Sequence, residues 1–213
     1  MLRKTGVMDP AFATDPETAA YYDRRAREYD DWYTGEGLFA TRSRPEWAPE
    51  VERIVELVQG LPAARTLDVA CGTGFLTRHL RGFVVGLDQS PEMVRIAQSR
   101  LPGGLALVGD ALALPVADAS FDRLFTGHFY GHLPDREREV FLAEARRVAS
   151  ELVVIDTARR EDTPPERWEE RVLGDGSRHR IYKRFLSSEQ LAEELGGEPL
   201  FAGRWFVAAR VRF

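Results

Sequence analysis

The residues that could do chemistry in this sequence begin with a glycine-rich stretch, Asp68–Gly74, which reads DVACGTG. The apolar run Leu67–Ala70 in front of it predicts a short buried strand. Gly72 and Gly74 then predict a tight turn, in which the backbone can approach a ligand without a Cβ in the way. From Thr73 the apolar spacing changes to that of a helix, so unpaired N–H groups at a helix start would face the ligand.

Two further acids stand at comparable places in the chain. Asp88 ends a second apolar run, twenty residues after Asp68, and Asp110 follows a third apolar run, Leu105–Val108. Carboxyl ends of neighbouring parallel strands share one edge of an open α/β sheet, where such sheets bind ligands. An acid at the position of Asp88 can accept hydrogen bonds from both hydroxyls of a ribose. Strand-end aspartates are also common cap and loop residues, so each role is a prediction.

Two ligand classes use such a strand, turn and helix. A dinucleotide needs GxGxxG, and Thr77 occupies the third glycine position here, which disfavours an NAD(P)-dependent oxidoreductase. The stretch Asp68–Gly74 instead resembles the (D/E)xGxGxG motif of the class I S-adenosylmethionine (SAM)-dependent methyltransferases. Ala70 replaces the first glycine, as is common in the ubiquinone/menaquinone-biosynthesis-like branch. The resemblance implies SAM as cofactor, S-adenosylhomocysteine (SAH) as product and a small-molecule methyl acceptor.

The resemblance also implies how the adenine is read. The segment Gly109-Asp110-Ala111 is similar to the family motif in which the carboxylate accepts the exocyclic amine and the next N–H donates to the ring. Leu112 would then pack on that ring. The complete set of predicted cofactor-binding residues is Asp68, Ala70, Cys71, Gly72, Gly74, Asp88, Gln89, Met93, Asp110, Ala111, Leu112, Tyr22 and Tyr29.

Near the N-terminus, the segment Tyr21–Tyr33 is unusually aromatic. It resembles the YDxxAxxYD opening of many small-molecule methyltransferases, with Tyr22 and Tyr29 at the family's spacing. The resemblance implies a lid of about residues 16–49, and aromatic faces suit both a sulfonium cation and an adenine. The same rings could instead simply hold an N-terminal helix on the core, and the two interpretations are compatible.

The segment after the predicted fourth strand, Ser120–Thr126, concerns the acceptor. It reads TGHFYGHL over residues 126–133, where methyltransferases of exocyclic or amide nitrogens often carry (D/N)PP(Y/F). Adenine or glutamine methylation is therefore not expected. His128 is the candidate to accept a proton from a substrate hydroxyl or amine. His128 and His132 could equally have structural roles, and no catalytic residue is assigned.

A basic alternating segment lies further along the chain. Alternation over Arg178–Phe185 predicts a strand with four side chains on one face, those of Arg178, Arg180, Tyr182 and Arg184. Arg180 and Arg184 are candidate substrate-binding residues, because guanidinium groups can hold a carboxylate or phosphate bidentately. The alternative is a solvated edge strand whose charges deter aggregation. The preceding stretch, 159–175, is predicted to be broken by prolines and then helical.

The whole chain predicts one α/β domain spanning residues 1–213. We expect a Rossmann-like, seven-stranded, mostly parallel sheet with an antiparallel edge strand and helices on both faces. About residues 157–186 would form an insertion on the substrate side. Within this fold the main alternative to an enzyme is a catalytically silent SAM-binding module with a regulatory or assembly role.

Composition excludes several function classes. The net charge of −5 disfavours nucleic acid as a partner. The single cysteine allows no disulfide within a monomer and suits a cytoplasmic location. No apolar run predicts a membrane span or a signal peptide, and no metal site is predicted. The acceptor and the oligomeric state do not follow from the sequence.

Overall fold

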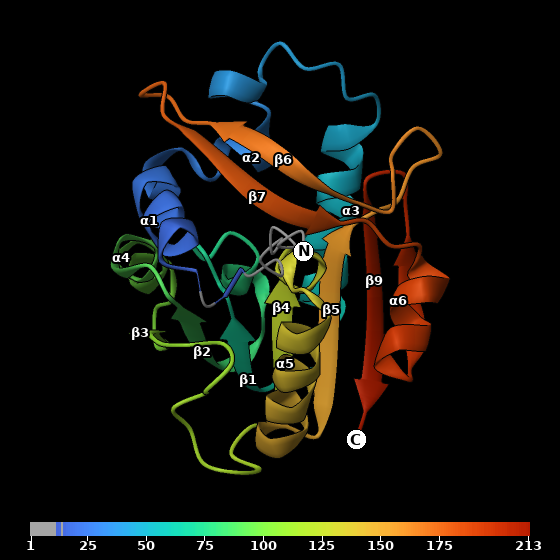
Figure 1. Cartoon of the computed structure of the whole chain (residues 1–213). Helices are drawn as coiled ribbons and strands as arrows, with labels where there is room; N and C mark the ends of the chain where they lie inside the picture. The colour runs from blue at the N-terminus through green and yellow to red at the C-terminus, as the bar shows by residue number, and fades with distance from the viewer. Residues whose placement is uncertain (1–11, 14) are drawn as a thin grey trace, which may run out of the picture.

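The computed structural model describes residues 12, 13 and 15–213, and its centre is a seven-stranded sheet in the order β3-β2-β1-β4-β5-β9-β8 (Figure 1). The strands are β1 (Ala64–Val69), β2 (Gly82–Asp88), β3 (Leu105–Val108), β4 (Arg123–Gly127), β5 (Glu151–Thr157), β8 (Glu198–Ala202) and β9 (Phe206–Arg212). Strands β1 to β5 are parallel, and β9 pairs antiparallel with both β5 and β8. The predicted fold, a mostly parallel sheet with an antiparallel edge pair, is confirmed.

Helices cover both faces of this sheet. The described residues form α1 (Pro16–Arg25), α2 (Asp31–Thr34), α3 (Trp47–Gly60), α4 (Pro91–Arg100), α5 (Asp135–Val148) and α6 (Ser188–Leu195), with short 3-10 turns η1 (Ala26–Glu28), η2 (Gly37–Phe39), η3 (Thr77–His79) and η4 (Tyr130–His132). Alternate residues of β5 face opposite layers, as strand geometry requires. Leu152 and Val154 pack with α5 and α6, whereas Val153 and Ile155 pack with α3. In this part of the chain, every helix is too short or too polar to cross a lipid bilayer.

The connection from β1 to β2 differs from the expectation. Residues 70–81 join the two strands and contain only η3, so the α-helix predicted from Thr73 is absent. Glycines with positive φ stand near the start of this connection, at Gly72 and Gly74, and another, Gly82, begins β2. Too few residues remain between them for a helix of ordinary length. The glycine turn therefore presents its backbone to the cavity without a long helix behind it.

The helix predicted within residues 159–175 is also wrong. This stretch contains β6 (Glu166–Val172), which pairs antiparallel with β7 (Arg178–Arg184) in a separate two-stranded sheet. Glu169 forms ion pairs with both Arg167 and Arg171. A spacing of two residues places these side chains on one face of a strand, whereas helical pairs need a spacing of three or four.

Candidate cofactor and acceptor site

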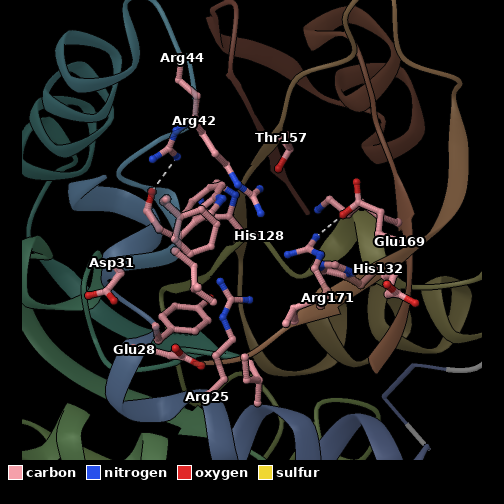
Figure 2. Close-up of a pocket in the computed structure, with 18 of the residues that line it drawn as sticks. Arg25, Glu28, Asp31, Arg42, Arg44, His128, His132, Thr157, Glu169 and Arg171 are labelled. Atoms are coloured by element: carbon pink, nitrogen blue, oxygen red, sulfur yellow. Dashed lines mark hydrogen bonds and ion pairs between the residues drawn. The ribbon is translucent and has the colours of Figure 1, made fainter. Parts of the chain in front are cut away.

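Two adjoining cavities lie above the carboxyl ends of the parallel strands. The smaller cavity, about 470 Å³, is lined by residues that follow β1, β2, β3 and β4. The larger cavity, about 610 Å³, lies between the N-terminal segment and the β6–β7 hairpin (Figure 2). Tyr22, Tyr29 and His128 line both. These three side chains therefore form the boundary across which a group could pass from one cavity to the other.

The glycine turn forms one wall of the smaller cavity. Ala70 and Gly72 both line it and both have positive φ, 58° and 55°. A Cβ added at Gly72 would lie 3.2 Å from the ring of Tyr29. The absence of a side chain thus lets Tyr29 lie directly over the turn, as a close approach between backbone and ring requires.

Asp88 is a nearly buried carboxylate on the same wall, 7% exposed. Its Oδ2 accepts the N–H of Gly72 at 2.9 Å, and its Oδ1 accepts the N–H of Ser90 at 2.9 Å. Burial raises the pKa of Asp88 to about 6, although these backbone N–H groups oppose the rise. Each carboxylate oxygen keeps a further lone pair. Asp88 therefore fixes the turn and can still accept hydrogen bonds from a ligand.

We expect the substitution Asp88→Ala to weaken SAM binding by about 1.5–3 kcal/mol, the scale of hydrogen bonds to a charged group. This corresponds to roughly a 10- to 150-fold rise in Kd by isothermal titration. The N–H groups of Gly72 and Ser90 lose their acceptor, so a lower Tm should accompany the loss. An unchanged Kd in the folded variant would remove Asp88 from the binding site.

The other predicted cofactor residues divide into two groups. Gln89, Asp110, Ala111 and Tyr22 line the smaller cavity, together with Ala70, Gly72, Asp88 and Tyr29. Five do not: Asp68, Cys71, Gly74, Met93 and Leu112. Met93 is fully buried in α4, and a Cβ at Gly74 would lie 3.3 Å from the backbone of Ala97 in the same helix. Met93 and Gly74 thus lie behind the wall of the cavity and support it.

Asp68 lies beneath the turn. It is buried, and its Oδ2 accepts the hydroxyl of Thr77 at 2.6 Å, while its Oδ1 has no hydrogen-bond partner among the described residues. Burial raises the pKa of Asp68 to about 8, against the lowering effect of the Thr77 hydroxyl. The neutral acid is therefore the dominant form of Asp68 at neutral pH.

The smaller cavity is also lined by residues that the sequence did not indicate. Phe12, Ala13, Gly127 and Phe129 line it in addition to the predicted set. The backbone N–H of Phe12 donates to the Glu137 carboxylate, and the Phe12 ring stacks on His132, with centroids 4.5 Å apart. Phe12 lies in a polar stretch without periodicity, so no signal pointed to it.

The two aspartates of the aromatic N-terminal segment anchor that segment to the sheet domain. Asp23 accepts the Ser90 hydroxyl at 2.8 Å, at the start of α4. Asp30 accepts the Thr73 hydroxyl in the glycine turn and forms an ion pair of 2.6 Å with Arg100 at the end of α4. The side chains of Asp23 and Asp30 thus point toward α4 and the glycine turn, while the neighbouring Tyr22 and Tyr29 line the cavities.

We expect the segment Tyr21–Tyr33 to gain protection from hydrogen exchange when SAM is added. A ligand in the smaller cavity would contact Tyr22 and Tyr29 and so add packing to this segment. The amides of α6 serve as an internal control, because no residue of that helix lines either cavity. Equal protection of the segment in both states would mean a fixed structural element.

His128 lines both cavities, and both of its ring nitrogens are buried. It has φ of 60°, its ring packs edge-on against Trp32, and both ring nitrogens lack hydrogen-bond partners among the described residues. Burial lowers the pKa of His128 to about 3; nearby Asp156 opposes this and Lys183 adds to it. The imidazole is therefore neutral and is a weak base, suited to accepting a hydrogen bond. His132 instead contacts the backbone carbonyl of Tyr182 through Nδ1.

The structure does not bring Arg180 or Arg184 into either cavity. Arg180 covers the ring of Trp168, and Arg184 forms an ion pair with Glu194 at 2.7 Å. The alternate residues of the same hairpin face the larger cavity instead, among them Lys183 and Arg171. The substrate role of Arg180 and Arg184 therefore stays a prediction without support from this geometry.

Comparison with known proteins places this geometry in a context. The family described as "Methyltransferase domain" matches residues 67–152. The demethylmenaquinone methyltransferase of Thermotoga maritima is 39% identical over 102 residues, 46% of this chain and 44% of that protein. The 2-methyl-6-phytyl-1,4-hydroquinone methyltransferase of Synechocystis is 34% identical over 155 residues, 67% of this chain and 48% of that protein. The chain thus spans about half the length of these curated relatives.

Solved structures match over more of the chain. The DhpI–SAH complex has a TM-score of 0.69 at 28% identity, and covers 91% of this chain and 94% of its own. The DhpI–SAM–HEP complex has a TM-score of 0.74 at 29% identity, with 91% and 95% covered. The similarity to these two structures therefore extends well beyond residues 67–152, which the family model matches.

Proposed function

We propose that this chain is a class I SAM-dependent methyltransferase of the ubiquinone/menaquinone-biosynthesis-like kind, and that it transfers the methyl group of SAM to a small-molecule acceptor. Its similarity to the methyltransferases named above supports this proposal. The observation that carries this proposal is the pair of cavities that meet at Tyr22, Tyr29 and His128. One cavity has the chemistry of a nucleoside site, and the other is large enough for an acceptor. The protein's one cysteine, Cys71, is free and buried, which suits a reducing cytoplasm.

The residues of the smaller cavity fit SAM. Gly72 has no side chain, so the Tyr29 ring can lie over the turn, and the amino-acid end would lie beside both in the cavity that they line. Asp88 offers carboxylate lone pairs to the ribose hydroxyls, and Asp110 with Ala111 lines the far end, where the adenine would be read. When bound, SAM supplies an electrophilic methyl group on a positively charged sulfur.

The protein's own contribution would be orientation and exclusion of water. Tyr22 and Tyr29 present aromatic faces at the boundary, which favour a cation and cover the reacting groups. The neutral imidazole of His128 could accept a hydrogen bond from the acceptor and orient it. Methyl transfer from a sulfonium neutralises the charge at sulfur, so it needs no strong base on the protein. The proton that the methylated acceptor loses would pass to solvent.

Two measurements test this proposal. Isothermal titration with SAM and with NADH should give binding of SAM alone. Labelled SAM, incubated with the protein and a small-molecule metabolite extract, should then transfer its methyl label to an extract component. The Gly72→Val variant, expected not to bind SAM, is the matched blank. Binding of SAM without transfer to any component would favour the silent cofactor-binding module.

A further inference from the structure

The larger cavity has a surplus of positive charge. Seven basic side chains line it, from Arg25, Arg42, Arg44, Arg160, Arg167, Arg171 and Lys183. Four acidic side chains do so, from Glu28, Asp31, Glu169 and Glu170. This surplus stands out in a chain whose net charge is −5. Basic groups gathered in a cleft raise the local concentration of anions.

Several of these cations are already neutralised. Lys183 pairs with buried Asp156, Arg160 pairs with Asp162, and Glu169 pairs with both Arg167 and Arg171. Arg25, Arg42 and Arg44 have no carboxylate within ion-pair distance among the described residues. All three lie within residues 16–49, which are called the N-terminal segment below. The cations without an ion pair are therefore concentrated on one wall, which also carries the carboxylates of Glu28 and Asp31.

Arg25 is the most informative of the three, because it is only 6% exposed. Its Nη1 donates to the Tyr21 hydroxyl at 2.9 Å, and its guanidinium lies 4.9 Å from the centre of the Tyr29 ring. One neutral acceptor and an aromatic face compensate a buried guanidinium only in part. An oxyanion beside it would form charge-assisted hydrogen bonds in place of the lost water.

Arg44 contributes from the rim of the cavity. Its Nη1 donates to the Trp32 carbonyl at 2.9 Å, and its guanidinium lies 3.9 Å from the centre of the Trp47 ring. Burial lowers the pKa of Arg44 from its ordinary value. Figure 2 shows Arg25 and Arg171 directed toward the same space as His128. A group held there would lie next to the boundary with the cofactor cavity.

Resting on the proposed function, we propose that Arg25 and Arg44 form an anion subsite for the acceptor, which carries a carboxylate or phosphate group. An apolar quinone with no anionic group would leave the buried Arg25 with only the Tyr21 hydroxyl and the Tyr29 ring as partners. The subsite lies on the N-terminal segment, across the larger cavity from the hairpin residues Arg171 and Lys183. The anionic group is held in the larger cavity while the methylated atom faces Tyr22, Tyr29 and His128.

Sodium phosphate and sodium acetate, titrated at constant ionic strength into protein with and without saturating SAH, test the subsite directly. We expect saturable binding of at least one anion, and the stronger of the two identifies the class. Arg25→Met and Arg44→Met should each raise the Kd of that anion at least tenfold. Arg27→Met, on an exposed side chain of the same segment, should leave it unchanged.

The affinity for SAH provides the second readout. It should stay within twofold in all three variants, which also shows that they are folded. Phosphate and acetate binding that is absent, or equal in all variants, would overturn the subsite. A tenfold loss of SAH affinity in Arg25→Met would make Arg25 a cofactor ligand and would equally overturn it. Transfer of label from SAM only to uncharged acceptors would leave the methyltransferase proposal standing and end this one.

Discussion

The Gly72→Val variant is expected to lose measurable SAM binding while it remains folded. A Cβ at position 72 would lie 3.2 Å from the Tyr29 ring, and the two γ carbons of valine must occupy the cavity or displace that ring. The φ of 55° is also unfavourable for a β-branched residue, at a cost of about 1–3 kcal/mol. Isothermal titration should show at least a hundredfold loss, because the cofactor and the new side chain compete for one space.

A matched control separates exclusion from backbone strain. Gly103 has φ of 84°, and a Cβ there would meet nothing within 4 Å. Gly103→Val therefore introduces similar strain without blocking the cavity, and it should bind SAM as the unmodified protein does. Equal loss in both variants, or retained affinity in Gly72→Val, would mean that the ligand does not lie over this turn.

The second large effect concerns the pH dependence of stability. In the ligand-free protein, the pKa of Asp68 is about 8, against about 3.9 for an aspartate in an unfolded chain. Between these values the folded state keeps a proton that the unfolded state has lost. The free energy of unfolding therefore falls as pH rises, by up to about 1.4 kcal/mol per pH unit. From pH 5 to pH 7 this amounts to roughly 3 kcal/mol.

Asp68→Asn tests this, because asparagine cannot titrate and its carbonyl can still accept the Thr77 hydroxyl. Urea unfolding at pH 5, 6 and 7 should give a flatter pH profile for the variant than for the unmodified protein. Asp88, whose pKa is also raised, is present in both proteins, so the difference between their profiles reports Asp68 together with its interaction with Asp88. Glu161→Gln, on an exposed loop, is the control and should keep the original slope. Parallel profiles would show that Asp68 is ionised in the folded protein.

The sequence predicted the position of the three strand-end acids better than their roles. Asp88 and Asp110 line the smaller cavity as expected, because strand ends in a parallel sheet converge on one edge. Asp68 is one residue earlier relative to its strand end and is covered by the turn that follows it. Spacing along the chain identifies an edge of the sheet, whereas access to the cavity depends on how the turn closes.

The faces of the hairpin show a similar limit. Alternation in Arg178–Phe185 predicted a strand, and β7 confirms it. Alternation alone does not say which face turns toward the cavity, and the pairing with β6 decided this. The ion pairs of Glu169 with Arg167 and Arg171 require that β6 is a strand, since residues two apart then share a face, which here is the cavity side. Nor does the sequence reveal that Arg25 has no ion pair with any carboxylate that the structure describes, which depends on the folded chain.

The separate hydrogen bonding of β6 and β7 has a consequence for how new specificities could arise or be engineered. The hairpin shares no ladder with the main sheet, and its two ends are held together where Ala158 pairs with Leu186. Its turn can therefore change in length at little cost, since closing a longer loop costs little. Two side chains of β7 do tie the hairpin to the main sheet, because Lys183 pairs with Asp156 of β5 and Arg184 pairs with Glu194 of α6. An exchange of residues 159–185 between relatives that keeps these two cations would transplant one wall of the larger cavity and leave those ion pairs in place.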